Sequence, residues 1–217
     1  MEKRPIDFPD SVRPARKDPP KRFLQVFTPG YWRLAAREYT RLRTLCIAAL
    51  MAALIVAVEL LFIPVGENLR IMFSFLPAAL GGAIYGPLVA VGVGFVSDII
   101  GGALFPSGPF FFGYTLTAMA GGLLYGLLLY RSRITVLRLA VCKLCVNLLV
   151  NVLLGSVWSA MLMGNAYVYY LAKSIVKNTI LLPVEIVMLT LLFGALMPML
   201  KKYGVTLQKN KRFIDLW

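Results

Sequence analysis

The chain has 217 residues, of which 59% are hydrophobic and 15% charged, and its net charge is +13. A typical soluble domain is about 45–50% apolar and about 25% charged, so this composition excludes an ordinary water-soluble domain and predicts an integral membrane protein. The chain contains no histidine. This absence excludes His-ligated metal sites on the chain and nucleophile pairs of serine or cysteine with histidine.

The basic residues gather at the two ends of the chain. Residues 1–43 contain eleven Lys and Arg against five Asp and Glu, and residues 201–217 contain five against one. Because these ends flank apolar spans, cytoplasmic tails that follow the positive-inside rule are favoured over a nucleic-acid partner. We predict a basic cytoplasmic tail at 1–41 that includes a possible interfacial segment, a transmembrane domain at 42–200, and a basic cytoplasmic tail at 201–217.

Six apolar stretches lie between the tails, and each ends at helix-breaking or charged residues. A helix needs roughly 20 apolar residues to cross a bilayer. We therefore predict an all-α integral membrane protein with six transmembrane helices, the last of which should be kinked at Pro183. The predicted spans are residues 45–64, 71–86, 88–105, 110–130, 136–163 and 171–200.

The charges of the loops predict the orientation. Six spans place both termini on one side of the membrane, together with the loop that carries Arg131 and Arg133. The opposite loops carry little charge beyond Glu67 and Arg70. Because positive loops stay in the cytoplasm, both termini are predicted to be cytoplasmic.

Polar residues inside apolar spans are candidates for function. Asn147 and Asn151 are one helical turn apart and share a face, and Trp158 returns to roughly the same face. Lys173 and Lys177 are also one turn apart. Each pair has a structural alternative, because the lysines could extend to the outer lipid headgroups and the asparagines could join helices.

Three acidic residues, Glu59, Asp98 and Glu185, also lie within the spans. Glu59 and Glu185 could pair with lysines and hold helices together. Asp98 could accept a hydrogen bond from a ligand amino group, or it could tie two helices. The spacing of these residues matches no catalytic pair, so an intramembrane enzyme is the least favoured interpretation.

The predicted topology places cations and aromatic residues at the same depth. Arg70, Lys173 and Lys177 lie in the outer half of the membrane domain, so a cavity there should attract an anion. Aromatic walls together with cations suit a flat anionic ligand. The aromatic residues at this depth are Phe73, Phe75, Phe110, Phe111, Phe112, Trp158 and Tyr167.

Other patterns bear on partners and cofactors. Ala49, Ala53 and Ala57 recur every four residues in the first span, which allows close approach of another helix, either in a partner or within this chain. The chain has no Walker A motif, so ATP-driven work needs a partner. Cys142 and Cys145 match C-x-x-C in letters only, without a second pair. We therefore predict no metal and no cofactor.

Four runs of residues, at 70–77, 81–87, 96–100 and 105–113, resemble the substrate-binding S components of energy-coupling factor (ECF) vitamin transporters, most closely the folate-specific group. The similarity extends over about residues 42–200. One position departs from the family pattern: Lys173 stands where the family has an arginine, and a lysine cannot make the bidentate fork that arginine makes with a carboxylate.

The resemblance implies a multi-pass protein of a prokaryotic plasma membrane that binds a vitamin, here folate, and is not an enzyme. It implies as partners a shared transmembrane coupling subunit and two ATPase subunits, with Ala49, Ala53 and Ala57 matching the coupling motif of the first helix. The ligand-binding residues are then predicted to be Arg70, Phe73, Ser74, Phe75, Asp98, Gly108, Pro109, Phe111, Asn147, Asn151, Trp158, Lys173, Lys177 and Asn178.

Two alternatives stay open beside this interpretation. The chain could be an S component for another heterocyclic vitamin such as thiamine. It could also be a membrane scaffold protein of cell-wall elongation, which should lack a polar cavity. A small molecule that co-purifies tightly with the protein would distinguish a binding subunit from a scaffold.

Overall fold

The computed structural model describes residues 42–66, 69–105, 111–130, 132, 134–163 and 166–202, together with Trp32 and Ala36. The predicted tails therefore lie almost entirely outside the described residues. In chain order the elements are α2 (Leu42–Glu59), β1 (Phe62–Gly66), β2 (Leu69–Met72), α3 (Phe75–Tyr85), α4 (Pro87–Leu104), α5 (Phe112–Leu129), α6 (Val136–Cys145), the π-helix η2 (Val146–Leu154), α7 (Gly155–Met163) and α8 (Tyr167–Lys202).

Each of the six predicted spans contains a helical segment, and α6, η2 and α7 follow one another without a break as the fifth. Four of the described segments are long and apolar enough to cross a membrane, which is consistent with a helical membrane protein. These are Pro87–Leu104, Phe112–Leu129, Val136–Leu162 and Tyr167–Leu196, and the shorter apolar helices are Thr44–Glu59 and Phe75–Tyr85.

The all-α prediction missed a two-stranded hairpin between the first two helices. The first helix ends at Glu59 rather than at Pro64, and β1 pairs antiparallel with β2, with Ile63 opposite Ile71 and Pro64 opposite Arg70. The run contains β-branched residues, and Pro64 cannot donate the next helical hydrogen bond. Because the hairpin takes up the start of the predicted second span, α3 has only 11 residues.

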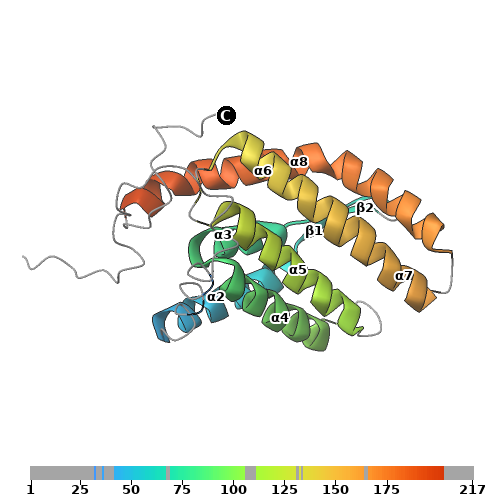
Figure 1. Cartoon of the computed structure of the whole chain (residues 1–217), viewed down its shortest axis with the longest axis horizontal. Helices are drawn as coiled ribbons and strands as arrows, with labels where there is room; N and C mark the ends of the chain where they lie inside the picture. Colours follow the sequence, from blue (N-terminus) through green and yellow to red (C-terminus); the bar gives the residue numbers. More distant parts are fainter. Residues whose placement is uncertain are drawn as a thin grey trace, which may run out of the picture.

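The helices form two groups. One group contains α2, α3, α4 and α5, and the other contains α8 packed along α6, η2 and α7, which together form one continuous rod (Figure 1). The helix α5 joins the groups, because it contacts α6, η2 and α7 as well as α3 and α4. Fully buried Leu129, Leu139, Leu189 and Phe193 form a dry core where α5, α6 and α8 meet.

Glycines let α4 and α5 approach until backbone touches backbone. A β-carbon on Gly94 would lie 2.7 Å from the carbonyl oxygen of Ala118, and one on Gly122 would lie 2.5 Å from that of Ala90. Small residues at such contacts allow van der Waals packing between helices in lipid. The turn before α4 depends on Gly86, whose φ of 87° is a conformation that other residues rarely adopt.

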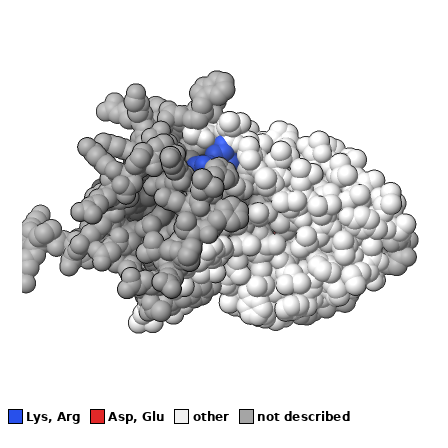
Figure 2. Space-filling view, in the orientation of Figure 1, with Lys and Arg blue, Asp and Glu red and all other residues white. Residues whose placement is uncertain are grey.

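The outer surface of the described helices is apolar. In Figure 2 the described part of the visible face carries almost no charge. Large apolar side chains project outward from the long helices, for example Val96 and Ile100 on α4, Leu148 on η2, and Val187 and Leu191 on α8. A soluble protein rarely exposes apolar patches of this extent, so this surface is suited to contact with lipid.

The glycine contact generates a stability prediction. Gly122→Ala should lower the stability of the purified protein in detergent by about 1–3 kcal/mol, because its methyl group would overlap a backbone oxygen that cannot move away cheaply. Gly121→Ala is the matched control, since a β-carbon there meets no atom within 4 Å. Thermal unfolding of the two variants checks this, and equal melting temperatures would contradict the close contact.

Candidate functional site

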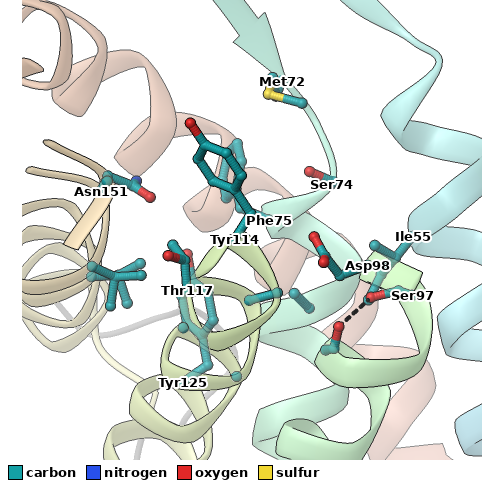
Figure 3. Close-up of a pocket in the computed structure, with 18 of the residues that line it drawn as sticks. Ile55, Met72, Ser74, Phe75, Ser97, Asp98, Tyr114, Thr117, Tyr125 and Asn151 are labelled. Carbon is teal, nitrogen blue, oxygen red and sulfur yellow. Dashed lines mark hydrogen bonds between the residues drawn. The ribbon is translucent and has the colours of Figure 1, made fainter. Parts of the chain in front are cut away.

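A cavity of about 690 Å³ lies between the two helix groups, within the range of small-molecule sites. Its lining comes from helices of both groups and from Met72 at the end of β2 (Figure 3). Seven of the predicted ligand-binding residues contribute to this lining. They are Ser74, Phe75, Asp98, Asn151, Lys173, Lys177 and Asn178.

The other predicted residues are placed differently. Asn147, Phe111 and Trp158 lie one layer behind the cavity lining, as the contacts below show, and Phe73 is not part of the lining. Gly108 and Pro109 lie outside the described residues, and for Arg70 the structure describes the backbone in β2 but not the side chain.

On the α4 side the polar group of the cavity is Asp98. Its Oδ2 accepts a hydrogen bond of 2.6 Å from Thr115 Oγ1, which ties α4 to α5. The carboxylate points into the cavity, and beside it Ser97 donates to the carbonyl oxygen of Gly94 over 3.1 Å (Figure 3). Asp98 is therefore a helix tie, and because a carboxylate offers two oxygens, its Oδ1 can still accept from a ligand.

Aromatic side chains lie behind the cavity lining on the α5 side. Trp158 Nε1 donates to Thr117 Oγ1 over 3.1 Å, and its ring lies 5.7 Å from that of Phe111. Gly113 makes room for this pair, because a β-carbon there would lie 2.6 Å from Trp158 Cδ2. From α5 itself, the rings of Tyr114 and Tyr125 reach the cavity, and Figure 3 shows Tyr114 projecting across it next to Phe75.

A buried ion pair forms part of the lining in the second helix group. Lys143 Nζ lies 3.2 Å from Glu185 Oε1 and 3.9 Å from the centre of the Phe75 ring. The other carboxylate oxygen, Oε2, accepts from Asn147 Nδ2 over 2.8 Å, and Asn147 Oδ1 accepts from Asn151 Nδ2 over 3.0 Å. The predicted pairing of Glu185 with a lysine is thus confirmed, and it joins α8 to the α6–η2 rod.

Lys143 is one of the cavity-lining residues that the sequence analysis did not include in the predicted site. It lies between Cys142 and Cys145 in the sequence. A signal was available, because Lys143, Asn147 and Asn151 follow one another at four-residue intervals inside an apolar span. Tyr114 was also missed, and it carries no comparable signal, since aromatic residues are common throughout the chain.

The N-terminal part of α8 supplies the predicted cations. Lys173 and Lys177 line the cavity one turn apart, and Lys173 is solvent-exposed. Ser174 between them donates to the backbone carbonyl of Asn151 over 3.2 Å, and Asn178 Nδ2 donates to the carbonyl of Ser174 over 2.8 Å. These bonds hold the first turns of α8 against η2, so the lysines have a defined position beside the cavity.

The alanine stripe of the first helix lies on its exposed side, away from the other described helices. Ala49, Ala53 and Ala57 are exposed, whereas Ala52 between them is only 2% exposed and packs in the core. Among the described residues this exposure favours a contact with another helix over internal packing of the stripe, the other of the two interpretations. The exposed alanines leave a shallow face on which a second helix could lie.

Comparisons with known proteins agree with this architecture. The profile of a family described as "ECF transporter, substrate-specific component" matches residues 43–199. A "Folate transporter FolT" of Clostridium novyi (strain NT) is 34% identical over 121 residues, which cover 56% of this chain and 70% of the relative. Another of that name from Leuconostoc mesenteroides subsp. mesenteroides is 30% identical over 129 residues, with the same coverage of 56% and 70%.

A solved structure has the same fold. It is described as "Crystal structure of FolT bound with folic acid", and it superposes with a TM-score of 0.60 at 28% sequence identity, covering 67% of this chain and 88% of that one. The family consists of transporter subunits and not of enzymes, as the residue patterns had indicated. The family resemblance seen in the sequence is confirmed, and the chain belongs to the substrate-specific components of ECF transporters.

Proposed function

We propose that this chain is the high-affinity folate-binding subunit of an ECF-type importer. The observation that carries the proposal is the cavity of about 690 Å³, which combines aromatic faces and acceptors with the lysines of α8. The FolT relatives and the folic acid-bound neighbour support folate as the ligand. A cavity with this many polar groups argues against the scaffold alternative.

The chemistry of folate corresponds to the parts of the cavity. A flat pterin ring needs aromatic faces, which Phe75 and Tyr114 offer, and hydrogen-bond partners for its edge, which Asp98 and Asn151 offer. The glutamate tail carries two carboxylates, and the cations that can bind them are Lys173 and Lys177. In this arrangement the ring lies between the helix groups and the tail lies toward the start of α8.

Removing one cation that is proposed to bind the glutamate tail should affect folate more than a ligand without the tail. Lys177→Ala should weaken folate binding by about 1.5–3 kcal/mol, or roughly ten- to a hundredfold, and should weaken a pterin without the glutamate tail much less. Calorimetric titration of both ligands checks this, with Lys202→Ala at the other end of α8 as the control. An equal loss of affinity for the two ligands would show that Lys177 does not contact the tail. Tight binding of thiamine in place of folate would overturn the assignment of folate as the ligand.

The driving energy comes from partner subunits in this proposal, since the chain has no Walker A motif. The partners are a shared transmembrane coupling subunit and two ATPases. The exposed alanine stripe of α2, formed by Ala49, Ala53 and Ala57, is the contact surface for the coupling subunit. Small side chains there permit a close helix contact that can form and separate reversibly.

Bulky side chains on the stripe should uncouple binding from transport. Ala53→Leu or Ala57→Leu should abolish most folate uptake by cells while the isolated subunit binds folate as tightly as before, because the stripe does not line the cavity. Ala195→Leu, at an exposed position of α8, is the matched control and should leave uptake unchanged. Loss of binding in the Ala53 and Ala57 variants would instead place the stripe in the fold of this subunit.

The orientation completes the proposal: six membrane crossings in a prokaryotic plasma membrane, with the basic tails at 1–41 and 201–217 in the cytoplasm. The basic loop at Arg131 and Arg133 supports it. The two shorter helices, α2 and α3, each account for one crossing, and the hairpin that connects them extends both.

Accessibility labelling tests this orientation. In a chain whose three native cysteines are replaced, a cysteine at position 108 should react with a membrane-impermeant maleimide added to intact cells. A cysteine at position 204 should react only after the cells are lysed. Reaction of position 204 in intact cells would overturn the cytoplasmic location of the C-terminus.

A further inference from the structure

The hydrogen bonds around Glu185 are all donated toward its carboxylate. Lys143 donates to Glu185 Oε1 and Asn147 donates to Oε2, while Asn151 donates to Asn147 Oδ1. Lys143 is 2% exposed, Asn147 2% and Glu185 9%, so water has little access to most of this chain of contacts. We call these four residues, Lys143, Glu185, Asn147 and Asn151, the polar relay.

The carboxylate of Glu185 determines the orientation of the Asn147 amide and, through it, that of Asn151. An ionised carboxylate can only accept, so Asn147 must present its NH₂ group to Glu185 and its oxygen to Asn151. Asn151 must then use one N–H of its NH₂ group on Asn147, so its Oδ1 lies on the side of the amide away from Asn147. Figure 3 shows this oxygen directed into the cavity, and among the described residues no donor bonds to it. Turning the Asn151 amide around would place two oxygens against each other.

We propose that the polar relay fixes the Asn151 amide with its Oδ1 toward the cavity, so that the site selects a heterocycle whose edge presents an N–H donor there, such as a ring amino group. This inference rests on the proposed function and adds a selection rule to it. Glu185 acts as a positioning residue, because its effect reaches the ligand through Asn147. An oxo-substituted edge would face Asn151 Oδ1 with a second acceptor, and both oxygens would lose their hydrogen bonds with water.

A pair of ring compounds tests the rule on the unaltered protein. Pterin-6-carboxylate carries a 2-amino group, and lumazine-6-carboxylate carries an oxo group at the same ring position. The wild-type protein should bind the pterin more tightly by roughly tenfold, the value of one buried hydrogen bond. Asn151→Leu, which has a similar size and no polar group, should bring the ratio of the two dissociation constants close to one.

A substitution of Glu185 should reverse the orientation of the amides in the polar relay. In Glu185→Gln the lysine still requires the oxygen of residue 185, so the new NH₂ group faces Asn147 and turns both asparagine amides around. Asn151 would then present a donor, and the preference should shift toward the lumazine by tenfold or more relative to the wild type. Lys143→Gln is the comparison variant, because it breaks the same ion pair but keeps the carboxylate; it should weaken the binding of both compounds without reversing the ratio of their dissociation constants.

The outcomes separate the possible failures. Equal binding of the two compounds by the wild type overturns the inference, even if the Glu185 variant does not fold. An equal shift of the ratio in Glu185→Gln and Lys143→Gln also overturns it, because both variants would then act only through the lost ion pair. Folate binding without any preference between the rings refutes the selection rule alone, whereas absence of folate binding refutes the proposed function and the rule together.

Discussion

The carboxylate of Glu185 is the group on which the interior of this protein depends. It lies on α8 in the middle of an apolar helix, and both partners of its oxygens, Lys143 and Asn147, come from the α6–η2 rod. An uncompensated charge in such surroundings typically costs about 3–5 kcal/mol when a partner is removed. The same two contacts that join the helices also place the polar residues beside the cavity, so packing and recognition depend on one side chain.

Different interactions hold the helices together within each of the two groups. The cavity lies where the two groups meet. In the first group, glycines such as Gly94 and Gly122 bring backbones into direct contact, with few polar side chains. In the second group, buried polar contacts join α8 to the rod. A ligand between them therefore meets on one side a wall in which Glu59, Ser97, Asp98 and Thr117 lie among apolar residues, and on the other side a hydrogen-bonding wall, which suits a flat ring with polar edges.

Sequence reasoning located the helices well, because apolar length is a strong signal in a membrane protein. It did not find the hairpin at residues 62–72, since a short apolar run reads equally well as helix or strand. It placed Asn151 at the cavity but put Trp158 on the same face by counting 3.6 residues per turn. The π-helix η2 upsets that count, and Trp158 instead bonds to Thr117 on α5 behind the lining. Backbone irregularity of this kind has no signature in composition or periodicity.

The π-helix also bears on how this pocket could change among related chains. Its wider turns keep Lys143, Asn147, Asn151, Gly155 and Ser159, which are spaced four apart, along one side of the rod. Loss of a single residue within 146–154 would allow ordinary α-helical bonding to resume, because a π turn holds one residue more than an α turn. Such a deletion would change which side chains of this segment face the cavity, while the Lys143 anchor before it and α7 after it kept their places. Length variation of one residue in this helix, rather than substitution alone, is thus a route by which the scaffold could acquire a new ligand.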